Sequence, residues 1–423
     1  MIARTAASAV LGHMRAGHVE IVEPDGTRHE FGPPDADLST TLRAHDPGFW
    51  RALARGSRAL AELYAEDGWD ADDMVTAVRI GAREMSRLDG LRRPFAPLRN
   101  AFTRVPRNTR AGARRHIAAH YDLGNEMFRL FLDESMTYSC AYFETPAMTL
   151  HEAQLAKLDR VCRKLELNPD DHLVEIGTGW GSLALHAAGE YGCRVTTTTI
   201  SKEQHAVASE RMRAAGLDDR VQVVMLDYRD LTGSYSKLAS IEMIEAVGWQ
   251  YFDVFFRCCS NLLAPDGVML LQAITISDSA YEIEKGSRSF AKELIFPAGC
   301  LPSVEVISRS VAKQTDMRLL DLDDITASYP PTLAAWRENF TAKTPQLEQL
   351  GYDRRFRRVW ELYLIWSEGG FRERRIQDYQ VLFAKPTYRA SRAHALLAAA
   401  SSDAGGPREA SFASAGRQPS GST

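Results

Sequence analysis

The fold is decided by one stretch, Val174-Glu175-Ile176-Gly177-Thr178-Gly179-Trp180-Gly181-Ser182. The segment that leads into it, residues 171–174, predicts a short buried strand, and residues 183–188 after it predict a helix packed on a sheet. Strand, glycine turn and helix in this order form a nucleotide-sized pocket, because the three glycines allow a tight turn, approach of a ligand and close packing of the helix. A glycine run alone is weak evidence, since many such matches are structural turns.

The next strand indicates which nucleotide is bound. A dinucleotide-binding unit usually carries an acidic residue about twenty positions after the first glycine, where it holds the ribose hydroxyls. Residues 194–200, Arg-Val-Thr-Thr-Thr-Thr-Ile, contain no carboxylate. Glu175 instead stands two residues before Gly177, and the pattern Glu-x-Gly-x-Gly-x-Gly resembles the first motif of S-adenosylmethionine-dependent methyltransferases. Methyl transfer is therefore favoured over hydride chemistry.

Composition narrows the class of protein. The chain has 423 residues, 45% hydrophobic and 25% charged, as is usual for a globular protein with a sizeable core. Its net charge of −4 argues against general nucleic-acid binding. No apolar run reaches membrane-spanning length and the N-terminus lacks a signal-peptide core, so we expect a cytoplasmic protein. The cysteines lack zinc-ligand spacing, and we expect no metal site.

The chain is expected to form two domains. Residues 1–90 predict a small α+β domain, which we interpret as a docking or homodimerisation domain. It would contain a β-hairpin over residues 19–31 and helices over residues 47–66 and 71–86. A methyltransferase domain would then occupy residues 116–388.

Two segments of unusual composition flank this second domain. Residues 91–115 contain eight arginines and no carboxylate, and three prolines make this stretch a linker rather than one long helix. Its arginines and phenylalanines suit an anionic bilayer surface, at about 1 kcal/mol per basic residue close to the lipid, although a solvated linker is an equally good interpretation. A basic helix after Arg354 is another candidate for lipid contact, unless it is an ordinary surface helix. Residues 389–423 predict a mostly disordered tail.

Further motifs make a specific resemblance. Between residues 120 and 143, aromatic side chains are interleaved with polar ones that a simple core would avoid, so a ligand-facing lid is at least as good an interpretation as ordinary core. From about residue 111 to Lys385, the chain resembles the cyclopropane-fatty-acyl-phospholipid synthases and mycolic-acid cyclopropane synthases. The motifs that carry the resemblance are His120-Tyr121-Asp122, Tyr138-Ser139-Cys140, the loop 175–181, Thr199-Ile200-Ser201-Lys202-Glu203-Gln204 and Glu245-Ala246-Val247-Gly248.

The resemblance implies the fold and the cofactor site. The fold would be α/β, a methyltransferase-type, mostly parallel sheet with helices on both faces. Apolar runs over residues 221–226, 238–244 and 268–271 would be buried strands, and residues 379–384 a last, antiparallel strand. Asp227 and Glu245 would then stand at carboxyl ends of strands, where open α/β sheets bind ligands. By resemblance, the residues around S-adenosylmethionine are Tyr138, Ser139, Glu175, Gly177, Gly179, Gly181, Thr199, Ser201, Gln204, Tyr228 and Arg229.

The resemblance also implies the chemistry. An alkene is a weak nucleophile, so its methylation needs close alignment with the sulfonium and a dry pocket that tolerates a carbocation. In the family, a bound bicarbonate ion is thought to accept the proton that then leaves, and the matching residues here are Cys140, Glu245 and Tyr329. The family's histidine is missing, and Gln272 takes its place. Glutamine donates a hydrogen bond to an anion but does not titrate near neutral pH.

These patterns predict methyl transfer from S-adenosylmethionine to the cis double bond of an unsaturated acyl chain. The expected substrate is a phospholipid, reached by peripheral association with the inner face of the membrane. The expected product is a cyclopropane. If the neutral amide of Gln272 leaves the base delayed or displaced, the product is instead a methylene branch, which a partner reductase would convert to a methyl branch. Two hypotheses compete with this one: a methyltransferase for a soluble small molecule, and a nucleotide-binding regulatory protein without catalysis.

Overall fold

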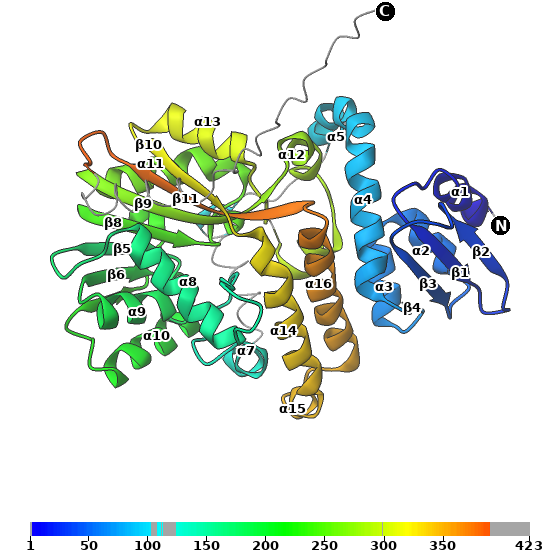
Figure 1. Cartoon of the computed structure of the whole chain (residues 1–423), viewed down its shortest axis with the longest axis horizontal. Coiled ribbons are helices and arrows are strands. Elements are labelled where there is room, and N and C mark those ends of the chain that lie inside the picture. The colour runs from blue at the N-terminus through cyan, green and yellow to red at the C-terminus, as the bar shows by residue number, and fades with distance from the viewer. Residues whose placement is uncertain (1, 103–107, 111, 113–123, 298, 390–423) are drawn as a thin grey trace, which may run out of the picture.

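The computed structural model describes residues 2–102, 108–110, 112, 124–297 and 299–389, and a seven-stranded sheet forms its core (Figure 1). In order across the sheet, the strands are β10 (Arg318–Asp324), β11 (Ile376–Ala384), β9 (Leu263–Ile276), β8 (Tyr235–Ile241), β5 (His172–Ile176), β6 (Arg194–Thr198) and β7 (Val221–Val224). The neighbours from β9 to β7 are parallel, whereas β11 runs antiparallel to both β9 and β10. The predicted α/β methyltransferase-type fold is therefore confirmed.

Helices cover both faces of this sheet, because successive residues of a strand point to opposite sides. On β5, Leu173 belongs to one apolar cluster and Val174 to another. Leu270 and Leu271 of β9 divide in the same way. The covering helices are α8 (Leu150–Lys164), α9 (Ser182–Glu190) and α10 (Lys202–Ala214) on one face, and α11 (Phe252–Leu262) and α13 (Val304–Gln314) on the other. Two apolar cores thus hold the sheet and its carboxyl edge in place.

The N-terminal residues form a separate four-stranded sheet. In spatial order its strands are β2 (Arg28–Phe31), β1 (His18–Val22), β3 (Ser39–Ala44) and β4 (Trp69–Ala71). The predicted hairpin is confirmed, since β1 and β2 pair in antiparallel. The helix expected over residues 47–66 is two helices, because Gly56 breaks it with φ +97. The helices of this region are α1 (Ile2–Leu11), α2 (Phe49–Arg55), α3 (Ser57–Ala65) and α4 (Met74–Arg92).

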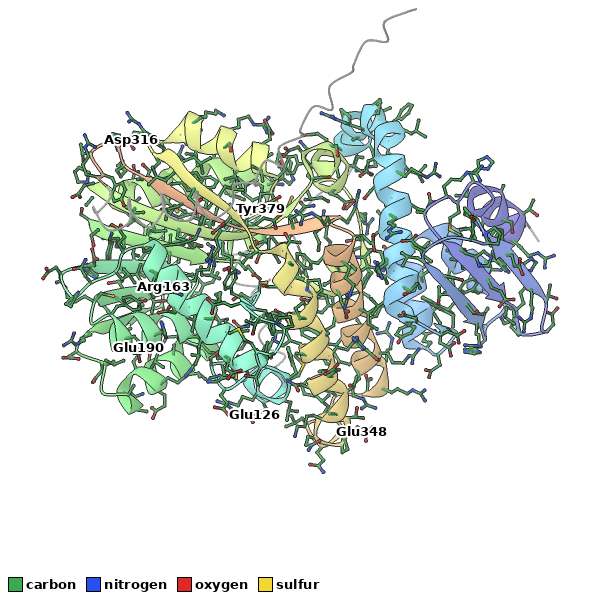
Figure 2. All side chains as sticks on the ribbon, viewed as in Figure 1. Glu126, Arg163, Glu190, Asp316, Glu348 and Tyr379 are labelled. Carbon is green, nitrogen blue, oxygen red and sulfur yellow. The ribbon has the colours of Figure 1, made fainter. Side chains whose placement is uncertain are left out.

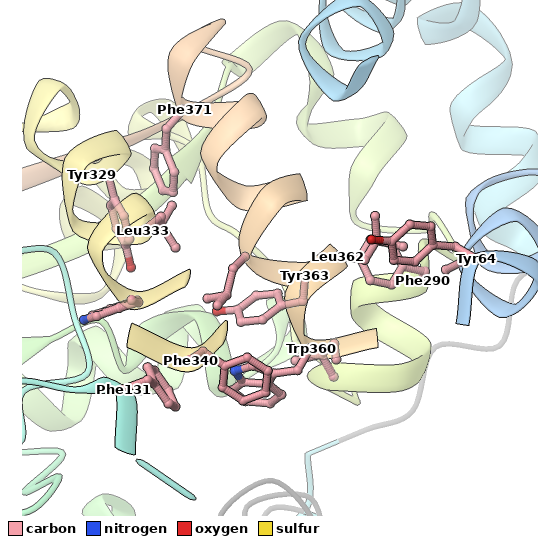
Figure 3. Packing of buried hydrophobic residues seen from close by; sticks show 14 of the residues in the cluster. Tyr64, Phe131, Phe290, Tyr329, Leu333, Phe340, Trp360, Leu362, Tyr363 and Phe371 are labelled. Carbon is pink, nitrogen blue, oxygen red and sulfur yellow. The ribbon is translucent and has the colours of Figure 1, made fainter. Parts of the chain in front are cut away.

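Helix α4 stands between the two sheets (Figure 1) and packs on α16 (Arg354–Arg372). One apolar cluster continues from Ile21 of the N-terminal sheet to Trp360 and Phe371 of α16; Figure 3 shows part of it. The remaining helices are α5 (Ala96–Phe102), α7 (Asn125–Phe131), α12 (Asp278–Glu284), α14 (Tyr329–Ala342) and α15 (Thr344–Gln349). Within the described residues, no helix is long and apolar enough to cross a membrane.

Side chains fill the space between the sheet and its helices (Figure 2). Tyr379 of β11 is labelled near the middle of this view, and Asp316 and Glu348 are labelled near its edges. The functional residues must therefore be sought where strands end, because the faces of the sheet are occupied by packing.

The structure corrects several expected boundaries. The strand expected over residues 238–244 ends at Ile241, and the strand expected over residues 221–226 ends at Val224. In the segment expected to be a linker, α4 continues to Arg92, and a short turn leads into α5. The motif 120–122 and the tail from residue 390 lie outside the described residues.

Candidate active site

The glycine loop joins β5 to α9, and Gly177, Gly179 and Gly181 take positive φ angles of +108, +52 and +88. A Cβ added at Gly181 would lie 2.8 Å from Met212 Cε of α10, and one at Gly177 would lie 3.1 Å from Met243 Cγ. A Cβ added at Gly179 would meet no atom within 4 Å. Gly177 and Gly181 therefore permit close packing, whereas Gly179 borders open space in which a ligand can approach the backbone.

Glu175 is buried in β5, directly before this loop. Its Oε2 accepts a hydrogen bond from Thr197 Oγ1 at 2.5 Å. Burial raises the pKa of Glu175 to about 8, against the opposing effects of the Thr197 hydrogen bond and the charge of Lys157. A cation bound beside this carboxyl would favour its ionised form, so the group responds to the charge of a ligand.

The segment after β6 caps helix α10 and lies next to the glycine loop, since the N–H groups of Gly177 and Thr178 both donate to the Thr198 carbonyl. Thr199 Oγ1 donates to Gln204 Oε1 at 2.8 Å. Ser201 Oγ accepts the N–H of Gln204 at 3.3 Å, which is a common helix-capping contact. The predicted cofactor residues Thr199, Ser201 and Gln204 therefore lie next to the glycine loop. Their side chains hydrogen-bond within this segment.

Tyr228 and Arg229 begin a short 3-10 turn after β7. Nη2 of Arg229 lies 2.6 Å from Oδ2 of Asp227. Burial opposes ionisation of Asp227, but the hydrogen bonds from Arg229 outweigh it and lower the pKa of this carboxyl. The buried hydroxyl of Tyr228 has no hydrogen-bond partner among the described residues. Tyr228 can thus offer a hydrogen bond to a ligand, whereas Arg229 is held by Asp227.

Tyr138 and Ser139 approach the loop from another direction. Their segment contacts α9, because Ser182 Oγ donates to the Ser135 carbonyl at 2.5 Å. The buried Lys157 donates from Nζ to Ser139 Oγ at 2.7 Å. The Tyr138 hydroxyl lies 3.0 Å from a tyrosine hydroxyl of α16. Both predicted residues therefore lie near the loop, and protein groups hold their side chains.

A buried carboxylate, Glu242, lies at the centre of the residues expected to hold an anion. Its Oε1 accepts hydrogen bonds from the backbone N–H of Cys140 and from Nε2 of Gln272, both at 2.8 Å. Its Oε2 accepts a hydrogen bond from the Tyr329 hydroxyl at 2.6 Å. The structure thus brings Cys140, Gln272 and Tyr329 together, but around a side chain that the sequence analysis did not select.

Glu242 was missed because residues 238–244 were interpreted as one continuous strand. The strand ends at Ile241, and Glu242 starts the turn that follows it. Its φ of +46 lies in the left-handed region, which a residue other than glycine occupies only under strain. The available signal was the acidic residue itself, since a carboxylate inside an apolar run needs buried partners.

Two more carboxyl groups are buried beside Glu242. Glu245 Oε1 accepts the N–H of Ile274 at 2.5 Å, and its Oε2 has no partner among the described residues. Asp378 Oδ2 accepts a hydrogen bond from Gln272 Nε2 at 3.0 Å. Burial and then repulsion from Glu242 raise the pKa of Glu245 to about 8, and the same two causes raise the pKa of Asp378 well above its usual value. The three carboxyls therefore do not all carry charge at neutral pH.

Glu242 is the member of this cluster best able to carry the charge. Burial raises its pKa, but three hydrogen-bond donors and the positive charge of Lys157 oppose that rise. Asp378 has one oxygen, Oδ1, without a partner among the described residues. Because hydrogen bonds to the ionised form favour it, we place the negative charge on Glu242 and a proton on Asp378.

Gln272 is oriented by a second glutamine. Its amide oxygen accepts a hydrogen bond from Gln380 Nε2 at 3.1 Å, so its amide nitrogen faces both Glu242 and Asp378. In this structure Gln272 therefore donates to two protein carboxyls, and its expected role as a donor to a bound anion stays a prediction.

Cys140 contributes its backbone rather than its thiol. The thiol donates to the Ala141 carbonyl at 3.2 Å, and burial raises its pKa well above the usual value. Because the thiolate is the nucleophilic form, Cys140 is not set up to attack a substrate.

Comparison with known proteins covers the whole of this site. Residues 108–381 match the model of the mycolic acid cyclopropane synthetase family. The tuberculostearic acid methyltransferase of Mycobacterium tuberculosis is 36% identical over 379 residues, which are 86% of each chain. The cyclopropane-fatty-acyl-phospholipid synthase of Escherichia coli K12 is 37% identical over 352 residues, covering 81% of this chain and 87% of that protein.

A solved structure is similar as well. The structure of a mycolic acid cyclopropane synthase complexed with SAH and CTAB superimposes with a TM-score of 0.61 at 31% identity. The match covers 64% of this chain and 98% of that one. The shared part of the fold therefore accounts for nearly the whole of that protein.

Proposed function

Because this chain belongs to the mycolic acid cyclopropane synthetase family, whose members are S-adenosylmethionine-dependent methyltransferases, we propose that it methylates the cis double bond of an unsaturated phospholipid acyl chain. The methyl donor is S-adenosylmethionine. The methyltransferase activity and the lipid chemistry are shared with its relatives, and the phospholipid substrate and the product are the proposed part.

One observation carries the proposal: the glycine loop and Glu242 lie at the same edge of the sheet. Met243 packs against Gly177, and Ser240 Oγ donates to the Ile176 carbonyl at 3.0 Å. The ends of β5 and β8 are therefore in contact. A methyl donor bound at the loop would lie close to a buried base, and alkene methylation followed by proton loss needs both.

The residues at the loop fit S-adenosylmethionine. The bound cofactor supplies an electrophilic methyl group on a sulfonium sulfur. Gly179 leaves room for a ligand at the backbone, and Tyr228 has a hydroxyl without a partner among the described residues. Glu175 would ionise beside the positive charge of the cofactor, because only burial keeps its pKa high.

Three of the four residues expected to hold bicarbonate already bind a carboxylate of the protein, so this site does not fit that ion. The Cys140 N–H, the Gln272 amide and the Tyr329 hydroxyl already bind Glu242. A second anion here would meet the charge of Glu242 and would find these three donors engaged. The proposed reaction therefore does not include bicarbonate.

A phospholipid is proposed as the substrate because the Escherichia coli relative, matched over most of both chains, is named for acyl phospholipids. A surface suited to a bilayer lies where α4 leads into α5. Leu91, Phe95 and Leu98 are 72%, 70% and 65% exposed there, beside the exposed Arg93. Exposed apolar side chains next to basic ones suit the interface of an anionic membrane.

The basic start of α16 serves a different purpose. Arg354 and Arg358 pair with Asp67 of the N-terminal region at 2.9 and 3.1 Å. Arg357 pairs with Glu348 of α15 at 2.7 Å. These arginines connect parts of the protein, so the membrane surface is proposed at the α4–α5 junction instead.

Two products follow from the same methylated cation. Cyclopropane formation is proposed first, because the family model and the Escherichia coli relative are named for it. A methylene branch, which a partner reductase would reduce, is the second candidate. Gln272 favours it, since a neutral amide stands where the family resemblance implies a histidine. The tuberculostearic acid methyltransferase also matches a larger share of this chain than the cyclopropane synthase does.

Vesicles separate a lipid substrate from a soluble one and also identify the product. The purified protein is incubated with S-adenosylmethionine carrying a deuterated methyl group and with vesicles of unsaturated phospholipid, and the fatty-acid esters are analysed by gas chromatography and mass spectrometry. We expect label in the acyl chains, as a ring or as a methylene group. Vesicles of saturated phospholipid are the control. Label that never enters unsaturated chains would contradict the proposed function and would favour a soluble substrate.

A further inference from the structure

On the basis of the proposed alkene methylation, we propose that the Glu242 carboxylate is the base that takes the proton from the methylated acyl chain, and that turnover does not require bicarbonate. The proposal assigns a role to a residue that belongs to none of the motifs that carry the family resemblance.

Glu242 already occupies an anion site. Three donors converge on it from separate parts of the chain: the Cys140 backbone, the Gln272 side chain of β9 and the Tyr329 hydroxyl at the start of α14. Several donors aimed at one buried carboxylate are what stabilises an anion inside a protein. Here the anion is part of the chain itself.

The backbone holds this carboxylate next to the cofactor loop. Glu242 has φ +46, and its N–H donates to the Gln272 carbonyl at 2.8 Å. Strain of this kind costs about 1–3 kcal/mol and persists only where the surroundings impose it. The next residue, Met243, packs against Gly177. The strained turn therefore places Glu242 between the end of β8 and the glycine loop.

The surrounding charges disfavour a further anion beside Glu242. The titratable groups that face Glu242 are Lys157 of α8, Tyr329 of α14, Asp378 of β11, Cys140 and Glu245. Lys157 is the cation among them, and one of its three N–H donors is used on Ser139 Oγ. A second anion 4 Å from Glu242 would meet a repulsion of about 4 kcal/mol at an effective dielectric constant of about 20.

Burial also suits Glu242 to accept a proton. Its pKa is raised by burial and is held down by its donors and by Lys157. A buried carboxylate with a raised pKa is a stronger base than an exposed one, provided that it remains ionised. The protonated Asp378 nearby keeps the pair at one negative charge, so Glu242 can fulfil that condition.

The proposed step balances without another reactant. Methyl transfer breaks the bond between sulfur and the methyl carbon and forms a bond from that carbon to one alkene carbon, which leaves a carbocation at the other. Glu242 takes a proton from the transferred methyl group. The C–H electron pair closes the cyclopropane or, after a hydride shift, forms the exocyclic double bond. The protonated carboxyl returns its proton to water after the product leaves.

The test measures turnover of the full-length protein on unsaturated phospholipid vesicles in buffer freed of carbon dioxide, with and without added sodium bicarbonate. The wild type should be equally active in both. Glu242→Gln keeps the shape but cannot accept a proton, so its turnover should fall by about 100-fold or more, the range of a lost general base. Its affinity for S-adenosylmethionine should stay close to that of the wild type.

A second variant distinguishes loss of the base from misfolding of the protein. Glu242→Ala frees the three donors and leaves a space, so added bicarbonate or formate should restore part of its turnover. Glu361→Gln is the matched control, because Glu361 is a partly buried glutamate of α16 whose pKa is raised by burial, against the opposing charges of Arg358 and Arg337. Its turnover should stay near the wild-type value.

Distinct results would overturn the two proposals. A wild type that loses activity without bicarbonate and regains it on addition would show that Glu242 does not replace the ion. Near-normal turnover of Glu242→Gln would remove Glu242 from proton transfer. Failure of the wild type to methylate any unsaturated lipid in either buffer would instead contradict the proposed function itself.

Discussion

The hydroxyl of Tyr329 lies 2.6 Å from Oε2 of Glu242, although the two residues are 87 positions apart in the sequence. Tyr329 is the first residue of α14, and its ring stacks on Phe371 of α16 with ring centres 4.0 Å apart (Figure 3). Burial raises the pKa of Tyr329 well above its usual value, so its hydroxyl stays protonated. Glu242 therefore has a fixed donor that does not titrate in the physiological range.

Removing this donor should shift the pH dependence of turnover. In Tyr329→Phe the ionised form of Glu242 loses a hydrogen bond, so its pKa rises and activity is lost at a higher pH as the solution is acidified. We expect the acid limb of the kcat profile to move up by about one pH unit, because a hydrogen bond to a charged group contributes roughly 1.5–3 kcal/mol. Tyr281→Phe, a change at a buried tyrosine of α12, is the control. An unshifted acid limb would show that Tyr329 does not tune the base.

Gly179 should be essential for cofactor binding rather than for folding. In Gly179→Ala the new methyl group enters the space beside the loop, and we expect affinity for S-adenosylmethionine to fall about tenfold or more, which is 1.4 kcal/mol. Gly216→Ala is a matched control, since Gly216 has φ +66 and would also place its Cβ in open space. Both variants carry similar backbone strain, so calorimetry should show weaker binding only for Gly179→Ala. Equal affinities would place the cofactor elsewhere.

Cofactor binding should depend on pH through Glu175. This carboxyl has a pKa of about 8, so it is mostly neutral at pH 7 and becomes charged as the pH rises. The charged form attracts a cationic cofactor, so affinity should increase between pH 6 and 8, and binding at pH 7 should release protons. Calorimetry in buffers of different ionisation enthalpy measures that release. Glu175→Gln should abolish the pH dependence, and an unchanged slope in this variant would rule out Glu175 as its source.

Gln272 should influence the choice of product. Its amide orients Glu242 and Asp378 together, whereas an imidazole in Gln272→His would donate to one carboxyl at a time. We expect this substitution to shift any methylene product towards cyclopropane, measured by gas chromatography of the fatty-acid esters. An unchanged ratio in an active variant would show that the branch is decided elsewhere.

The exposed apolar side chains at the α4–α5 junction should bind membranes. Burial of one large apolar side chain contributes about 1.5–3 kcal/mol, so Phe95→Ser with Leu98→Ser should weaken binding to anionic vesicles roughly tenfold or more. Leu350→Ser is the control, because Leu350 follows α15 and is 46% exposed away from that junction. Sedimentation with vesicles measures binding. Equal binding of the double variant and the wild type would contradict the proposed surface.

The sequence by itself determined the fold class and the position of the glycine loop. Strand, glycine turn and helix are local patterns, because a turn with φ above zero needs glycine and buried parallel strands need continuous apolar runs. The motifs around Tyr138, Thr199 and Glu245 made the family recognisable for the same reason: each is a short contiguous stretch.

Only the tertiary structure decided what lies at the centre of the site. Glu242 lies inside an apolar run of the sequence, so the sequence analysis did not select it. Its partners Cys140, Gln272 and Tyr329 come from distant segments. A buried carboxylate is stabilised as an anion only where hydrogen-bond donors surround it. Here those donors come from segments that are distant in the sequence, so local patterns do not predict them. The raised pKa of Glu245 likewise depends on a neighbouring charge and on burial, which exist only once the strands are assembled.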